Sequence, residues 1–233
     1  MGLAEDSTFL NDILRETTYK CTQATDQTDW RPKHGHPCSN LDCTTRIRGP
    51  FDSFVLQEGG DDATLRNVPL DGVSASGIVL KPDSFCITFF KSKLGLNKAC
   101  DYLVLTEHKN TKYAIFIELK SSIYNDPDTK GNLRLLENKD ILTACQLNST
   151  SALFDYLCAV EKRVNKTTSL FGYSRHFAVL YDEVLRGTHK PIPTMTGKSA
   201  TKSLDPTTFS HKEIKAIKAE NNKRISIESL LSY

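Results

Sequence analysis

The chain of 233 residues is long enough for one large domain, and its 39% hydrophobic and 25% charged residues are typical of a globular protein. A formal net charge of +2 excludes a uniformly basic nucleic-acid clamp, so contact with nucleic acid would need a local basic patch. The apolar stretches YLVL and AIFI are far too short to span a bilayer, and residues 1–20 are too acidic and polar for a secretory signal. We therefore expect a cytoplasmic protein that does not contact membranes.

The first predicted element is a helix over residues 7–19, which begins at Ser7, a residue type that caps helix N-termini. Its apolar residues at 9, 10, 13 and 14 would form one face. Residues 21–83 are rich in Thr, Asp, Gly and Pro, and we interpret them as an irregular insertion with short strands. This large N-terminal insertion would belong to a single domain over residues 1–233.

Regular elements resume at residue 84, where the β-branched and aromatic residues of SFCITFFK predict a strand. DYLVLTEH and KYAIFIELK are two more predicted strands, and the short turn between them makes an antiparallel hairpin that is apolar on both faces. Apolar periodicity over residues 141–160 predicts the longest helix, and HFAVLYD, residues 176–182, predicts a fourth strand. Residues 183–233 are predicted as a basic loop and a C-terminal helical tail, with a helix near residues 210–221.

This order of elements predicts the α/β fold class. Three strands that are followed by a crossover helix and a further strand favour a mixed central β-sheet with helices on both faces. In the antiparallel hairpin, the start of one strand lies beside the end of the other. The residues at that end of the sheet are therefore expected to lie close together.

Three charged residues occupy that end. Asp101 opens one strand of the hairpin, and Glu118 and Lys120 close the other, where a spacing of two directs both side chains to the same face. Two converging carboxylates predict a site for Mg²⁺ or Mn²⁺, hard cations that prefer oxygen ligands. Lys120 would orient or deprotonate an attacking water, with its pKa lowered by the nearby cation.

This hairpin resembles the PD-(D/E)XK nuclease superfamily, which has the restriction-endonuclease-like fold. The features that carry the resemblance are Asp101, the apolar strand, the turn, AIFI and Glu118-Leu119-Lys120. The resemblance implies a core ordered α-β-β-β-α-β, with Asp101 and Glu118 as metal ligands and Lys120 as the water-activating residue. The Pro that precedes the Asp in this family is replaced by Cys100. Some branches carry a Gln on the following helix, and Gln146 matches it as a further catalytic residue.

By this resemblance the chain would be a metal-dependent nuclease that hydrolyses phosphodiester bonds, with DNA as the expected substrate. Similar small nucleases act in bacterial antiviral defence beside a helicase or ATPase, and such a protein partner is expected because the chain has no ATPase motif of its own. One alternative is a catalytically inactive nuclease-fold module that binds nucleic acid or assembles with a partner. Another is a junction resolvase, which would act as a homodimer.

Other polar residues complete the set of candidates. A third carboxylate could come from Glu16, Glu58, Asp61 or Asp62, although Gly59-Gly60-Asp61-Asp62 is typical of a turn. His34, His36, Cys38 and Cys43 have the chemistry of zinc ligands, but their spacing matches no standard finger, which favours a polar loop. Two sets of basic residues are candidates for contacts with DNA phosphates. One set lies in a loop without acidic residues and consists of Arg186, Lys190, Lys198 and Lys202; the other is Arg46 and Arg48.

Overall fold

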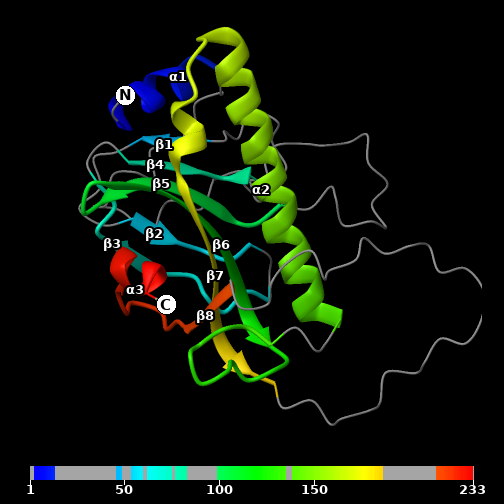
Figure 1. Cartoon of the computed structure of the whole chain (residues 1–233). Coiled ribbons are helices and arrows are strands. Elements are labelled where there is room, and N and C mark those ends of the chain that lie inside the picture. Colours follow the sequence, from blue (N-terminus) through cyan, green and yellow to red (C-terminus); the bar gives the residue numbers. More distant parts are fainter. Residues whose placement is uncertain are drawn as a thin grey trace, which may run out of the picture.

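The computed structural model describes residues 3–13, 46–48, 54–59, 62–74, 77–82, 99–134, 138–185 and 214–232. These residues form a mixed α/β fold with a six-stranded sheet and a three-stranded sheet, flanked by a few helices (Figure 1). Among the helices of this described part, none is both long and apolar enough to cross a membrane.

The six-stranded sheet has the strand order β1-β4-β5-β6-β7-β8. Its strands are β1 (Arg46–Arg48), β4 (Ile78–Leu80), β5 (Tyr102–His108), β6 (Thr111–Ile123), β7 (Ser174–Val184) and β8 (Ile214–Lys218). The pairs from β1 to β6 are antiparallel, whereas β7 is parallel to β6 and β8 is parallel to β7. The sheet is therefore mixed, as predicted.

The β5–β6 hairpin is confirmed. Its turn residues Lys109 and Asn110 have φ values of 50° and 61°, the left-handed conformation that matches the twist of two-residue hairpins. Residues 114–119 of β6 are all buried, because β6 is covered on both faces. The predicted fourth strand is confirmed as β7, and the predicted long helix as α2 (Asn138–Val164).

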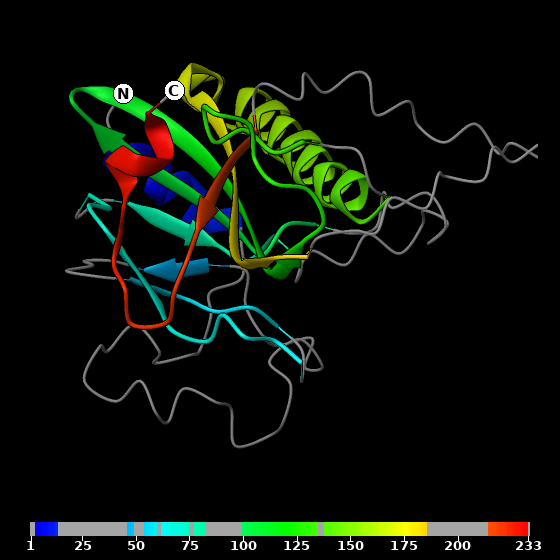
Figure 2. The ribbon, with the colours of Figure 1, turned by 90° about the horizontal axis from the view of Figure 1, so that it is seen from below.

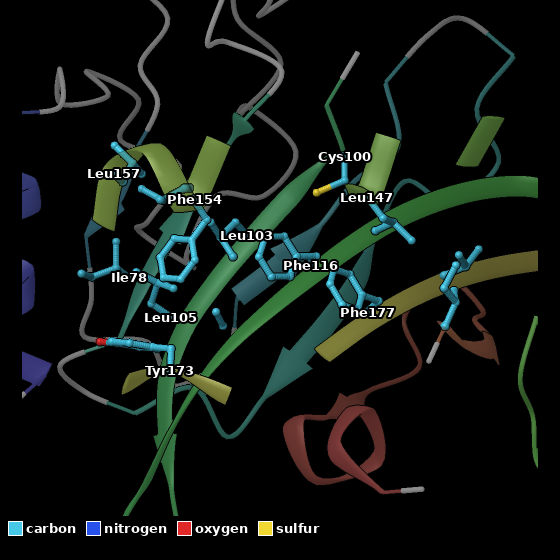
Figure 3. Packing of buried hydrophobic residues seen from close by; sticks show 14 of the residues in the cluster. Ile78, Cys100, Leu103, Leu105, Phe116, Leu147, Phe154, Leu157, Tyr173 and Phe177 are labelled. Carbon is cyan, nitrogen blue, oxygen red and sulfur yellow. The ribbon is translucent and has the colours of Figure 1, made fainter. Parts of the chain in front are cut away.

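Helix α1 (Leu3–Ile13) and α2 cover one face of this sheet. Figure 3 shows the core beneath them, in which Phe116 of β6 lies between Phe154 of α2 and Phe177 of β7. The rings of Phe116 and Phe177 are stacked with centroids 4.9 Å apart, and Phe154 meets Phe116 edge-on at 6.1 Å. These aromatic contacts join α2 to the two central strands.

The opposite face is covered by a three-stranded sheet, so the prediction of helices on both faces is wrong in part. This sheet consists of β2 (Phe54–Leu56), β3 (Val68–Asp71) and β9 (Ile225–Ser226), and the five-residue α3 (Ile227–Leu231) follows it. Figure 2 shows β2 and β3 on the side away from α2. The buried side chains Leu56, Leu70 and Ile227 share a core cluster with Ile115 and Ile117 of β6.

The second correction concerns the C-terminal segment, where a helix was predicted near residues 210–221. Residues 214–218 instead form β8, in which Ile214 and Ala216 are buried while Lys215 and Ile217 are partly exposed. This period of two is the pattern of a strand. The outer edge of β8 is covered by residues 131–133, since Gly131 O accepts from the Ala216 amide at 2.6 Å. The one helix within the described residues 214–232 is the short α3.

The predicted strand over residues 84–91 lies outside the described residues. The position beside β5 is occupied by β4, which comes from the segment that was predicted to be an insertion. That segment also supplies β1, β2 and β3. Residues 21–83 therefore contribute strands to both sheets, and the short strands expected within them are present.

Candidate active site

The structure brings Asp101 and Glu118 together at one end of the six-stranded sheet. Tyr102 of β5 pairs with Ile117 of β6, so Asp101, one residue before β5, lies opposite Glu118. The Asp101 amide donates to Glu118 Oε2 at 3.2 Å, and the Leu119 amide donates to Asp101 Oδ2 at 2.7 Å. Each carboxylate thus accepts a backbone hydrogen bond from the opposite chain segment, which fixes the two groups relative to each other.

Lys120 completes this cluster on the face of the sheet that α2 covers. Ala114 and Phe116 pack in the α2 core, so the alternation of β6 directs Glu118 and Lys120 to the same face. Lys120 Nζ donates to Glu118 Oε1 at 2.5 Å and to Gln146 Oε1 at 3.3 Å.

Gln146 connects the cluster to α2. Its side chain is half-buried, and its amide nitrogen donates to the backbone oxygen of Ala99 at 3.3 Å while its amide oxygen accepts from Lys120. One amide group therefore contacts both the lysine and the segment that leads into Asp101. Asp101, Glu118, Lys120 and Gln146 form a single hydrogen-bonded group.

Burial determines the electrostatics of this group. Glu118 is 1% exposed, and burial raises the pKa of its carboxyl above the ordinary value, against the opposing effect of the Lys120 ammonium. Burial acts to lower the pKa of Lys120, but the carboxylates of Glu118, Asp101 and Glu58 together raise it. Lys120 is therefore charged at neutral pH and acts as a hydrogen-bond donor, a state suited to orienting a water or phosphate rather than removing a proton.

The donor set fits a hard divalent cation. Two carboxylates face one ammonium, which leaves an excess of negative charge, and a carboxylate oxygen that accepts one hydrogen bond retains a second lone pair. In the described ranges, no group of three or more His, Cys, Asp or Glu side chains is arranged to hold a metal. A site with one or two carboxylates, completed by waters and substrate phosphate oxygens, is the usual arrangement for Mg²⁺.

Glu58 is the third carboxylate near this end of the sheet. It lies just after β2, and it accepts hydrogen bonds from the Ser121 amide at 2.8 Å and from Ser121 Oγ at 2.6 Å. Ser121 follows Lys120, so Glu58 links the smaller sheet to the end of β6. Of the other candidates, Asp62 is exposed, and Glu16 and Asp61 lie outside the described residues.

Sequence reasoning did not identify Thr150, whose hydroxyl accepts a hydrogen bond from the Cys100 amide at 2.8 Å. The available signal was its position four residues after Gln146, which places both residues on one face of the helix. Cys100 itself is buried, and burial raises the pKa of its thiol.

Several predicted sites cannot be placed. Two sets of candidates lie outside the described residues. They are the candidate zinc ligands, His34, His36, Cys38 and Cys43, and the candidate phosphate contacts, Arg186, Lys190, Lys198 and Lys202. Arg46 and Arg48 lie in the edge strand β1, and only their backbone is described. No family model, curated protein or solved structure matches this chain.

Proposed function

We propose that the chain is a metal-dependent nuclease that hydrolyses phosphodiester bonds, with DNA as its substrate. The observation that carries this proposal is the hydrogen-bonded group of Asp101, Glu118, Lys120 and Gln146 at one end of the central sheet. When β1, β2, β3 and the 3-10 helix before β7 are set aside, the elements α1, β4, β5, β6, α2 and β7 follow the order that the resemblance to PD-(D/E)XK nucleases implies, which supports the proposal.

In this proposal Asp101 and Glu118 would hold Mg²⁺ or Mn²⁺. When bound, the metal supplies Lewis-acid stabilisation of the phosphate charge and lowers the pKa of a coordinated water. Lys120 would donate to the attacking water or to a phosphate oxygen. Gln146 restricts the position of the Lys120 ammonium, because its amide oxygen accepts a hydrogen bond from it. The water oxygen forms the new bond to phosphorus, and the bond from phosphorus to the leaving sugar oxygen breaks.

The context of the reaction rests on resemblance. We infer a cytoplasmic nuclease of an antiviral defence complex, in which a helicase or ATPase partner would supply the energy-driven step. Arg186, Lys190, Lys198 and Lys202 would contact DNA phosphates, and a homodimer would be required if the substrate is a DNA junction.

The second candidate is an inactive module with the same fold. One observation favours it: both carboxylate oxygens of Glu118 and Oδ2 of Asp101 already accept hydrogen bonds, from backbone amides and from Lys120. Separation of the three charged residues would have been its strongest support, and instead they lie in hydrogen-bonding contact. This convergence makes the nuclease the better-supported function.

The test is cleavage of supercoiled plasmid and linear DNA with Mg²⁺ or Mn²⁺. Wild-type protein should cleave DNA with either metal and lose this activity in EDTA, and nicking of the plasmid would identify an endonuclease. Lys120→Met should lower kcat by at least ~10²-fold, because a positioned proton-transfer or donor group contributes 10²–10⁴-fold.

Lys162→Met is the matched control, because Lys162 is an exposed lysine near the C-terminal end of α2. It should retain wild-type cleavage. Equal activity of the Lys120 and Lys162 variants, or cleavage that persists in EDTA, would contradict the proposed site. Wild-type protein that cleaves neither substrate with either metal would contradict the enzyme and favour the inactive module.

A further inference from the structure

One turn of α2 holds the backbone that leads into Asp101. Thr150 Oγ1 accepts a hydrogen bond from the Cys100 amide at 2.8 Å and donates to the Gln146 backbone oxygen at 3.0 Å. Four residues earlier, the Gln146 side chain donates to the Ala99 backbone oxygen. The peptide group between Ala99 and Cys100 is therefore bonded at both its carbonyl and its amide to residues on a single face of α2.

This contact is sealed from water. Thr150 and Cys100 are both 0% exposed, so a water cannot replace the hydroxyl as the acceptor for the Cys100 amide. A threonine hydroxyl has one proton, and in this geometry that proton is directed to the Gln146 carbonyl. Its lone pairs then face the Cys100 amide, which makes Thr150 a fixed acceptor rather than a rotating group.

Asp101 depends on this contact because β5 begins only at Tyr102. The regular pairing between β5 and β6 ends at Tyr102 and Ile117, so Asp101 lies beyond it. The position of Asp101 is set by its own bonds to Glu118 and Leu119 and by the backbone on its N-terminal side. Thr150 holds the nearest residue of that backbone.

We propose that Thr150 is a positioning residue of the active site, which acts through the Cys100 backbone to hold the Asp101 carboxylate where a divalent cation is bound. The inference rests on the proposed nuclease function. Thr150 contacts neither metal nor substrate, so its removal should alter the metal requirement and kcat while the KM for DNA stays unchanged.

The test compares Thr150→Val with Thr106→Val. Valine has the shape of threonine without the acceptor, and Thr106 is a matched control because it is also 0% exposed and accepts a backbone amide, that of Ser74, at 3.0 Å. Thr106 lies near the opposite end of β5 from Asp101. Each variant leaves one backbone amide without its acceptor, but only Thr150→Val does so beside the site.

Thr150→Val should lower kcat by about 10-fold and raise the Mg²⁺ concentration for half-maximal activity by about 10-fold, since supporting contacts of metal ligands typically contribute 10–100-fold. Thr150→Ser, which keeps the hydroxyl, should restore both values. Thr106→Val should leave both unchanged. If the valine variant does not fold, Thr150→Cys, which keeps a weaker acceptor, should show an intermediate loss.

Hydrogen exchange of the Leu119 amide provides a readout that does not need activity, because this amide donates to Asp101 Oδ2. Its exchange should accelerate in Thr150→Val relative to that of the Phe116 amide, and it should not do so in Thr106→Val. If the wild-type protein has no nuclease activity but exchange accelerates in Thr150→Val, the positioning contact is upheld and the nuclease function is overturned. Active wild type with identical kinetics and exchange in both valine variants would overturn the role of Thr150 alone.

Discussion

Glu118→Gln is expected to reduce metal-dependent DNA cleavage by about 10³-fold or more, and to change how the stability of the folded protein depends on pH. The loss of activity follows from the loss of one of two anionic metal ligands, since a catalytic metal contributes several kcal/mol and each ~1.4 kcal/mol is a factor of ten. Glutamine keeps the size and shape of the side chain, so the packing around position 118 should be preserved.

The change in pH dependence follows from the pKa of Glu118, which burial raises above its ordinary value of 4.5. A raised pKa means that the folded state holds the proton to higher pH than the unfolded state does. The contribution of Glu118 protonation to the stability of the wild type is therefore complete below about pH 4.5, and it is lost as the pH rises through the pKa of Glu118 in the folded state. The glutamine side chain of the variant does not titrate, so the difference in unfolding free energy between variant and wild type should grow in favour of the variant from about pH 4 to pH 8.

Chemical denaturation of metal-free protein at several pH values would measure this difference, and cleavage assays on the same samples would measure activity. Glu107→Gln is the control, because Glu107 is exposed on β5 near the other end of the same hairpin. It should alter neither property. A Glu118 variant that cleaves DNA at the wild-type rate would remove Glu118 from the site, and a stability difference that shrinks as pH rises would contradict the argument from burial.

Phe116→Ala is expected to lower the unfolding free energy by about 3–5 kcal/mol, the usual cost of truncating a buried phenylalanine. Phe116 is fully buried, and its ring contacts both Phe154 and Phe177. The substitution would leave a cavity between α2, β6 and β7, two residues from Glu118. Equilibrium unfolding in urea would measure the loss.

Phe171→Ala provides the comparison, because Phe171 lies in a short 3-10 helix and is 52% exposed. Its truncation should change the unfolding free energy by no more than about 0.5 kcal/mol, as is usual for surface positions. Equal losses in the two variants would show that the aromatic cluster is not the core of the α2 face.

The elements that the sequence predicted well are long and have a strong periodic pattern. Strand β6 and helix α2 span 13 and 27 residues, so their apolar spacing repeats often enough to identify each element without its partners. The convergence of Asp101, Glu118 and Lys120 followed from the hairpin alone, because antiparallel pairing and the alternation of side chains set their positions.

The rest depends on contacts between segments that are distant in sequence. Strands β2 and β9 have three and two residues, too few for a periodic pattern. Both pair with β3, which begins at Val68, whereas β9 begins at Ile225. The helix predicted over residues 210–221 was favoured by its capping residues, but parallel pairing with β7 determines the strand that is present. The sequence named Glu58 among four candidate carboxylates without singling it out, and it did not identify Thr150. These residues bond to backbone amides 63 and 50 residues away, which no local pattern encodes.

The turn at Lys109 and Asn110 has a consequence for the chemistry at the far end of the hairpin. A slip of one residue in the pairing of β5 with β6 would exchange the two faces of β6. Glu118 and Lys120 would then point into the apolar layer beneath the three-stranded sheet, while Leu119 would occupy their place beside α2. The two left-handed residues fix the register from which every later position in β6 is counted. The hairpin turn thus determines which side chains lie in the candidate active site, although the turn is at the opposite end of the strand.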